Sequence, residues 1–275
     1  MKILFDYQIF LLQKYGGISS YYLKLISELI KQEHNTKIIT PLYISNVLNK
    51  LKNKNIVIGK KINKIPRFTT KIITRFNDLF FEYYIQKFKP QIVHYTYYNK
   101  IFNFSNTKKI ITVYDLIHEN LYNKKNVKNH DLWKKLQELT IADHVICISK
   151  NTQNELIDHY KIKKNKTSVI YLASKFEYNK DDLPINKYDP YLLFVGERFG
   201  YKNFENFIKS ISRSRLLKNK IKIFCFGTFP FTDKELALFK SEKINLENIN
   251  FMTGDDNLLK DLYLNSTALI YPSLY

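Results

Sequence analysis

Short runs of β-branched and aromatic residues alternate with longer amphipathic segments along the whole chain. Such runs are typical of buried parallel strands, and the segments between them have the length and periodicity of crossover helices. In the first part of the chain, the predicted strands are residues 2–7, 37–41, 55–58, 91–95, 109–114, 144–149 and 168–171. The predicted helices are 18–31, 71–89, 128–141 and 150–160. This pattern predicts an α/β fold that begins with one doubly wound unit.

A polar stretch without clear periodicity, residues 173–188, separates this unit from a second one. The second unit has predicted strands at 191–195, 222–226, 248–251 and 268–271, and predicted helices at 204–215, 233–242 and 258–264. We therefore expect an N-terminal domain (1–172), a linker (173–188) and a C-terminal domain (189–275). Further helix and strand normally follow four strands of such a sheet, so the second domain is expected to be incomplete.

The formal net charge of +19 on 275 residues predicts attraction to an anionic partner. Nucleic acid, an anionic membrane and a phosphorylated substrate all qualify, and a biased genome composition would produce the same lysine excess without selection for binding. Basic residues are dense between Lys31 and Lys89, where aromatic and aliphatic residues are interleaved. One hypothesis is peripheral attachment to an anionic membrane, and the alternative is a solvated helix face.

Cys147 and Cys225 lie inside apolar runs, where neither metal-ligand spacing nor a disulfide framework is present. They fit a reducing cytoplasm. Asp6 and Gln8 interrupt the first apolar run, which makes it a poor signal peptide, and no apolar stretch reaches membrane-spanning length. We expect a cytoplasmic protein that is soluble or bound at the inner membrane face.

Two loops that open helices are candidate anion sites. Gly16 and Gly17 precede the helix that starts near residue 18, where glycines allow close backbone approach and free N–H groups favour a diphosphate; a plain tight turn is the alternative. In VGERFGYKN, Arg198 and Lys202 follow a buried strand at the sheet edge where α/β folds place ligands. Two cations there can neutralise phosphates, and a solvated basic loop is the alternative.

Titratable residues follow two later strands of the first unit, in QIVHYTYYN and ITVYDLIHEN. His94, Asp115, His118 and Glu119 could hold hydroxyl groups or move protons, although Asp115 could equally cap a turn. A Ser/His/Asp elbow, a Walker-type loop and a His/Cys metal cluster are all missing from the sequence, which argues against hydrolases, kinases and metalloenzymes.

Eight segments in order resemble the family 4 group of retaining GT-B glycosyltransferases, in particular its mannosyltransferase-like branch. They are GGISSYY, PQIVHYTYY, ITVYDLIHE, ADHVICISKNTQNEL, KTSVIYLA, YLLFVGERFGYKNFENFI, FGTFPFTDKEL and LYLNSTALIYPSLY. The resemblance implies two Rossmann-like domains, with the donor diphosphate at Gly16, Gly17, Arg198 and Lys202. It also implies that Asp115 and His118 lie near the transferred sugar as candidate catalytic residues, and that His94, Tyr97 and Glu119 lie on the acceptor side.

The resemblance further implies sugar transfer with retention from a nucleotide-sugar, with GDP-mannose as a candidate donor, to a lipid-linked or saccharide acceptor in cell-surface polysaccharide synthesis. Neither a metal nor another cofactor is expected, because protein cations take the place of Mg²⁺.

Two departures from the family pattern matter. Tyr114 stands where many relatives have His, and the chain ends at Tyr275, before the Glu-Gly-Phe-Gly-like loop that contacts the donor sugar. An inactive truncated remnant that still binds a nucleoside diphosphate is therefore the second hypothesis. A basic nucleic-acid-binding protein is the third, supported by charge alone.

Overall fold

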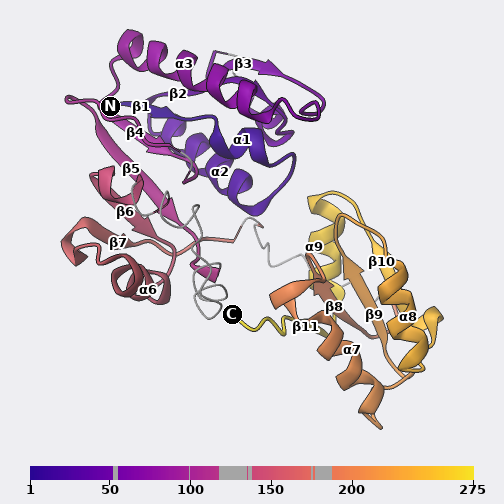
Figure 1. Cartoon of the computed structure of the whole chain (residues 1–275). Helices are drawn as coiled ribbons and strands as arrows, with labels where there is room; N and C mark the ends of the chain where they lie inside the picture. The colour runs from indigo at the N-terminus through magenta and orange to yellow at the C-terminus, as the bar shows by residue number, and fades with distance from the viewer. Residues whose placement is uncertain (52–54, 99, 118–134, 136–137, 175, 177–187) are drawn as a thin grey trace. The chain divides into compact units, whose positions relative to one another are not determined.

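The chain forms two compact units, Met1–Ala173 and Ser174–Tyr275, each with its own sheet and core (Figure 1). The computed structural model describes residues 1–51, 55–98, 100–117, 135, 138–174, 176 and 188–275. Among these residues, no helix combines the length and the apolar character needed to cross a membrane.

The first unit is built on a seven-stranded sheet in the order β3-β2-β1-β4-β5-β6-β7, and every neighbouring pair is parallel. The strands are β1 (Lys2–Phe5), β2 (Asn35–Tyr43), β3 (Val57–Lys61), β4 (Ile92–Tyr95), β5 (Lys108–Val113), β6 (His144–Cys147) and β7 (Thr167–Val169). The helices are α1 (Gln8–Leu12), α2 (Gly17–Lys31), α3 (Thr70–Phe88) and α6 (Lys150–Tyr160), with 3₁₀ turns η1 (Val47–Lys50) and η3 (Lys164–Lys166).

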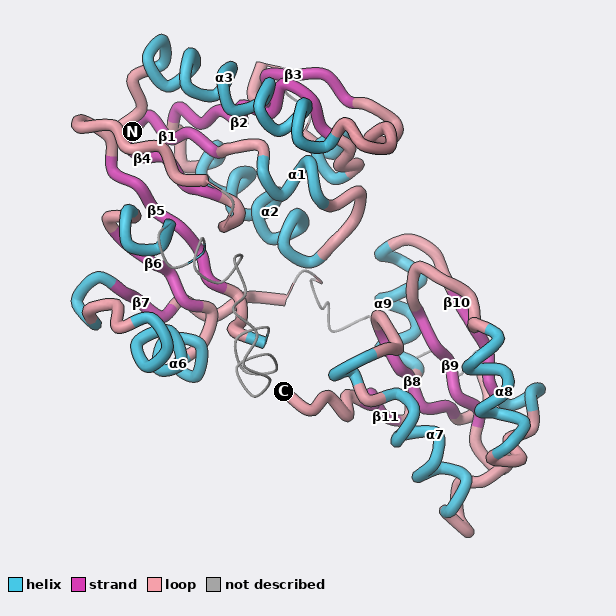
Figure 2. The backbone as a smooth tube through the Cα atoms, viewed as in Figure 1, coloured by secondary structure: helices cyan, strands magenta, loops and turns pink. Residues whose placement is uncertain are grey.

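Successive residues of β1 point into two different cores, as the two-residue period of a strand requires. Leu4 packs with Phe81 of α3, whereas Ile3 and Phe5 pack with Tyr22 of α2. Helices α3 and α2 lie on opposite sides of β1 and β2 (Figure 2). Both faces of the sheet are thus covered, which explains why its strands read as continuous apolar runs rather than alternating ones.

The five-residue helix α1 was not predicted from the sequence, where a short loop is expected between the first strand and Gly16. Ile9, Phe10 and Leu11 are all buried in α1. A single turn and a half is too short to show a helical period, so burial rather than pattern decides its conformation. The predicted helix 128–141 lies mostly outside the described residues, and its last part, 138–141, is helical.

The second unit has a parallel four-stranded sheet in the order β10-β9-β8-β11. Its strands are β8 (Tyr191–Val195), β9 (Lys222–Phe226), β10 (Ile249–Met252) and β11 (Ala268–Ile270). Its helices are α7 (Phe204–Arg213), α8 (Asp233–Ser241) and α9 (Asp256–Asn265), with 3₁₀ turns η4 (Gly200–Lys202) and η5 (Leu246–Asn248). Residues of α7 and α8 share one core with Phe194, while Leu262 of α9 packs with Tyr191 and Leu193 in the other.

Candidate functional site

The carboxyl end of β8 is shaped by a glycine in a conformation that other residues adopt with strain. Gly196 has a φ of 109°, and its N–H donates to the carbonyl of Phe226 at 2.8 Å. A side chain is disfavoured at such a φ, so Gly196 allows the chain to turn sharply out of the sheet. The residues that follow, including Arg198, are therefore held at the strand edge.

Arg198 turns back over the carboxyl end of β9 rather than into solvent. Its Nε donates to Oε1 of Glu235 at 2.6 Å, and its Nη2 donates to the carbonyls of Phe229 and Pro230 at 3.0 and 2.8 Å. The guanidinium also lies 4.8 Å from the ring centroid of Phe231, within cation–π range. The side chain is only 7% exposed, so its position is strongly constrained.

One nitrogen of this guanidinium has no hydrogen-bond partner in the described part of the chain. Nη1 of Arg198 lies 3.7 Å from the point that a Cβ on Gly227 would occupy. That Cβ would also meet the carbonyl oxygen of Gly196 at 3.0 Å, so only glycine fits here without displacement of its neighbours. The glycine therefore leaves space next to an unused charged donor.

Glu235 orients Arg198 and at the same time caps helix α8. Thr232 accepts a hydrogen bond from the backbone N–H of Glu235 at 3.3 Å, and the Glu235 carboxylate accepts one from the Thr232 N–H at 2.7 Å. Burial alone would raise the pKa of Glu235, but the hydrogen bonds from Arg198 and Thr232 and the charge of Arg198 lower it. The carboxylate is thus held ionised against the arginine.

Lys202 lies on the same loop as Arg198, but its side chain turns toward the other neighbour of β8. Its Nζ donates to the hydroxyl of Tyr271, just after β11, at 2.6 Å, and it lies 4.5 Å from the centroid of that ring. Arg198 contacts the β9 side and Lys202 the β11 side. The loop thus brings both predicted cations to one strand end while their side chains diverge.

A pocket of about 870 Å³ opens between the loop after β8, the first turn of α7 and the loop that enters α8. The residues that line it include Gly196, Arg198, Asn203, Thr228 and Glu235. The N-terminus of the ten-residue helix α7 carries free N–H groups, and these attract anions. The pocket therefore combines a buried cation, a helix N-terminus and room for a small ligand.

In the first unit, Gly16 and Gly17 open helix α2, and a glutamine occupies part of the space that they leave. A Cβ on Gly16 would lie 2.2 Å from Oε1 of Gln13, and that oxygen accepts from the N–H of Ser19 at 3.3 Å. Apart from its two chain neighbours and the nearby backbone of its own helix, no atom of the described chain lies within 4 Å of a Cβ on Gly17. Gln13 thus caps the helix, and the space beside Gly17 is open.

His94 lies in the core and not at the surface of the strand edge. Its ring stacks on Phe5 and meets Tyr22 edge to face, and its Nε2 is 2.9 Å from Oγ1 of Thr112. Burial lowers the pKa of His94 to about 3, so the imidazole stays neutral at physiological pH. In this arrangement it supports the aromatic core below the edge and does not reach a ligand itself.

Tyr97 and Asp115 lie just after β4 and β5, respectively. Tyr97 is half-buried and packs against the ring of Tyr98. Oδ1 of Asp115 accepts from the N–H of Ile117 at 3.3 Å, which is the capping role that the sequence left open. His118 and Glu119 lie outside the described residues.

Tyr114 is 8% exposed, and its ring contacts the edges of two tyrosines of α2, Tyr21 and Tyr22. Burial raises the pKa of Tyr114, so its hydroxyl stays protonated. The position at which the family resemblance implies His is thus filled by a neutral aromatic side chain in this chain.

Sequence reasoning missed Asp6, the carboxylate at the end of β1. Its Oδ1 accepts from the N–H of Thr96 at 2.9 Å, while Oδ2 is buried without a partner among the described residues. Burial raises the pKa of Asp6 to about 7. An acidic residue directly after the first strand was the available signal.

The described residues contain no group of three or more His, Cys, Asp or Glu placed to hold a metal ion.

Comparison with solved structures supports the architecture. The chain is similar to the lipopolysaccharide outer core galactosyltransferase WaaB, with 15% identity over 99% of this chain and 74% of that one and a TM-score of 0.63. A structure of S. aureus TarM with fondaparinux, alpha-GlcNAc-glycerol and UDP has 11% identity over 99% and 81% of the two chains, at a TM-score of 0.71.

The fold alone does not select the reaction. A structure of a UDP-N-acetylglucosamine 2-epimerase also matches, with 11% identity over 98% of this chain and 73% of that one and a TM-score of 0.55. Among curated protein sequences, none matches the chain.

The family is decided by sequence. The model of Glycosyltransferase Family 4 matches residues 15–173, which is more than half of the chain. That range contains Gly16, Gly17, His94 and Asp115. The expected GT-B architecture of two α/β units with parallel sheets is confirmed. The chain belongs to glycosyltransferase family 4.

Proposed function

We propose that the chain transfers a sugar from a nucleotide-sugar to a lipid-linked or saccharide acceptor, and that the carboxyl edge of the second sheet binds the donor diphosphate. The observation that carries this proposal is Arg198, which Glu235 holds in place while its Nη1 remains unused over Gly227. A positioned arginine costs little to reorganise when a phosphate binds.

The reaction breaks the bond between the anomeric carbon and the diphosphate oxygen and forms a bond from that carbon to an acceptor hydroxyl oxygen. Negative charge grows on the leaving diphosphate. Arg198, Lys202 and the N-terminus of α7 would stabilise it, and loss of one such donor typically costs about 3 kcal/mol. The acceptor proton passes to the leaving phosphate, and attack from the same face retains the configuration. These cations supply the charge that Mg²⁺ supplies in other transferases.

We assign the acceptor and the transferred sugar to the first unit, at Asp115, His118, His94, Tyr97 and Glu119. Of these, Asp115 and Tyr97 lie at strand ends, and His94 acts from below as a buried support. Gly16 and Gly17 would admit the donor phosphates beside α2. Since TarM is seen with UDP and WaaB is named a galactosyltransferase, UDP-sugars join GDP-mannose as candidate donors.

We further propose a role in the synthesis of a cell-surface polysaccharide or lipopolysaccharide, on the cytoplasmic side of the membrane. WaaB is named for lipopolysaccharide, and the complex of TarM contains alpha-GlcNAc-glycerol, so both relatives concern saccharide or glycerol-linked acceptors.

A transfer assay tests the proposal. The full chain is incubated with UDP-glucose, UDP-galactose, UDP-GlcNAc or GDP-mannose and a lipid extract, and nucleotide release and the anomeric configuration of the product are measured. We expect acceptor-dependent release with one donor, reduced at least tenfold by Lys202→Ala and unchanged by Lys220→Ala, which removes an exposed lysine before β9. Nucleotide binding without turnover would favour the inactive remnant, and tighter binding of oligonucleotides than of nucleotides would favour the nucleic-acid hypothesis.

A further inference from the structure

Helix α3 exposes a continuous stripe of large apolar side chains. Its buried face consists of Ile73, Asn77, Phe81 and Ile85, which pack on the first unit. The exposed face carries apolar residues at the same helical spacing, beginning just before the helix: Phe68, Ile72, Phe76, Leu79, Phe80 and Tyr83. Phe68 is 86% exposed and Ile72 is 70% exposed. A contiguous apolar stripe of this length on a surface helix indicates an interaction site.

Cations surround this stripe. Residues 55–89 contain eight Lys and Arg but only two acidic residues, Asp78 and Glu82. The guanidinium of Arg67 lies 4.9 Å from the ring centroid of Phe68, and Nζ of Lys87 lies 5.9 Å from that of Tyr83, so a cation borders the stripe at each end. Lys71 and Arg75 are both exposed on the helix.

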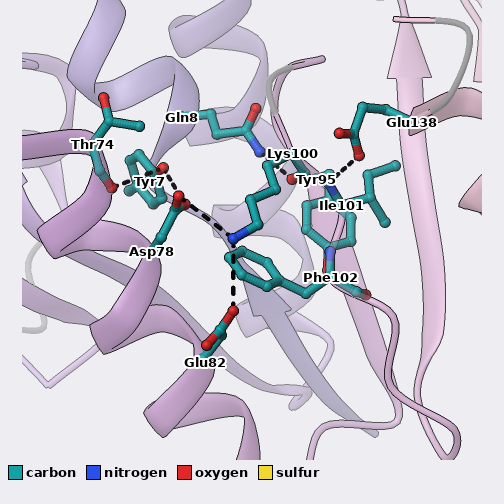
Figure 3. A network of polar contacts seen from close by, with 10 residues as sticks. All are labelled: Tyr7, Gln8, Thr74, Asp78, Glu82, Tyr95, Lys100, Ile101, Phe102 and Glu138. Atoms are coloured by element: carbon teal, nitrogen blue, oxygen red, sulfur yellow. Dashed lines mark hydrogen bonds and ion pairs between the residues drawn. The ribbon is translucent and has the colours of Figure 1, made fainter. Parts of the chain in front are cut away.

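The two acidic residues of α3 are engaged on another side of the helix. Asp78 and Glu82 each lie 3.7 Å from Nζ of Lys100, in the loop after β4, and Asp78 also accepts from the hydroxyl of Tyr7 at 2.6 Å (Figure 3). In the same network, Nε2 of Gln8 donates to the Lys100 carbonyl at 2.7 Å. These contacts join α3 to the loop after β4 and pair both of its carboxylates with a cation outside the helix.

The turn before α3 presents an aromatic ring at a backbone cost. Phe68 has a φ of 66°, a left-handed conformation that is rare for a bulky residue. A phenylalanine ring is usually buried, but this ring is the most exposed member of the stripe. Strained backbone positions cluster at functional sites, so an exposed ring in this conformation is consistent with an interaction site.

We propose that α3 and the turn before it dock the chain on an anionic lipid bilayer. The rings and aliphatic side chains would enter the headgroup boundary, and the surrounding Lys and Arg would face anionic lipid headgroups. The combination of apolar and basic residues favours this occupant over a second copy of the chain, whose α3 surface would carry the same positive charge. The exposed apolar side chains also argue against the alternative that this segment is only a solvated helix face.

This inference goes beyond the proposed function, because docking requires neither a sugar donor nor turnover. The two are linked only through the acceptor, since a lipid-linked acceptor would be present on the surface that α3 contacts.

Vesicle flotation tests the inference with the full chain, without nucleotide. Vesicles of phosphatidylcholine alone are compared with vesicles containing about 30% phosphatidylglycerol, at 50 and 500 mM salt. We expect binding to the anionic vesicles that weakens at least tenfold in high salt. Ile72→Ser with Leu79→Ser, and separately Lys71→Glu with Arg75→Glu, should each reduce binding at least tenfold.

Matched controls lie elsewhere on the surface. Leu216→Ser with Leu246→Ser removes exposed leucines of the second unit. Lys163→Glu with Lys164→Glu reverses the charge of two exposed lysines just before β7 of the first sheet. Both controls should bind as the wild type does. Equal losses in variants and controls, or indifference to anionic lipid, would overturn the inference. So would a wild-type dimer in sedimentation that the Ile72/Leu79 variant dissociates. Circular dichroism confirms that each variant is folded, and a failed transfer assay would leave this result unaffected.

Discussion

The carboxyl edges of the two sheets differ in whether their buried titratable side chains are neutral or charged. At the edge of the first unit, Asp6 and His94 are both buried, and burial shifts the pKa of each toward its neutral form. At the edge of the second unit, the hydrogen bonds and the charge of Arg198 hold Glu235 ionised. A neutral edge suits sugar hydroxyls, and an edge that keeps charged side chains suits a diphosphate, so the difference supports our proposal that the second unit binds the donor diphosphate.

The largest expected effect concerns His94. Its pKa is about 3 in the folded chain against 6.5 unfolded, so only the unfolded chain takes up a proton in that window. Stability is therefore lost as the pH falls from 6.5 toward 3, by an amount on the order of 4 to 5 kcal/mol from this residue. His94→Gln should remove that loss, of which about 2 kcal/mol falls between pH 7 and pH 5, where urea unfolding measures it. His159→Gln, on the exposed surface of α6, is the control. An unchanged pH dependence in His94→Gln would contradict the buried, neutral imidazole.

The contribution of Asp6 to stability should change with pH in the opposite direction, over nearly the same pH range. Its pKa is about 7 folded and 3.8 unfolded, so its stabilising contribution is complete below pH 3.8 and is lost as the pH rises through 7. Relative to that of the wild type, the free energy of unfolding of Asp6→Asn should rise by on the order of 4 kcal/mol between pH 4 and pH 8. Unfolding curves across this range measure it. Because the contributions of Asp6 and His94 change with pH in opposite directions, they largely cancel in the wild type. If the free energy of unfolding changes equally with pH in Asp6→Asn and in the wild type, the raised pKa of Asp6 is refuted.

Arg198→Ala tests the charged edge. It leaves Glu235 largely buried without its main partner, so the free energy of unfolding of the second unit should fall by about 3 kcal/mol. Lys202→Ala removes an exposed contact with Tyr271 and should change it by less than about 0.5 kcal/mol. Hydrogen exchange of peptides from α8 reports the loss locally. Equal protection in the two variants would mean that the Arg198 pair does not hold this edge together.

The smallest predicted effect compares one helix cap in each unit. Thr232→Ala and Ser149→Ala each remove a side chain that accepts from a backbone N–H, of Glu235 and Thr152 respectively, and each should cost about 1 kcal/mol. Only Thr232→Ala should also weaken nucleoside diphosphate binding, because Thr232 helps to orient Glu235. Similar losses of binding in both variants would show that stability rather than orientation is responsible.

The sequence pattern predicted the elements well where they are long or fully buried. The bounds of α6, β8 and β9 agree to the residue with the expected 150–160, 191–195 and 222–226. Helix α1 was missed because five residues show no period, and its conformation depends on contacts made by the folded chain.

The candidate site was only partly predictable for a related reason. Strand ends identify Gly16, Arg198 and Lys202 from the sequence, because parallel strands bring their carboxyl ends to one edge. The partner of Arg198 is 37 residues away, and no local pattern states that pairing. The spacing of Thr232 and Glu235 is that of a capping box, a local signal that we did not use, and it carries no information on the arginine that the same carboxylate holds.

Calorimetric titration of the full chain with UDP and GDP tests the central claim, that the charged edge of the second unit binds the donor diphosphate. We predict that the wild type binds at least one of them, that Arg198→Lys and Lys202→Ala each weaken this binding at least tenfold, and that Lys220→Ala leaves it unchanged. Binding that is equally strong in all four proteins would contradict the claim and would place the diphosphate elsewhere on the chain.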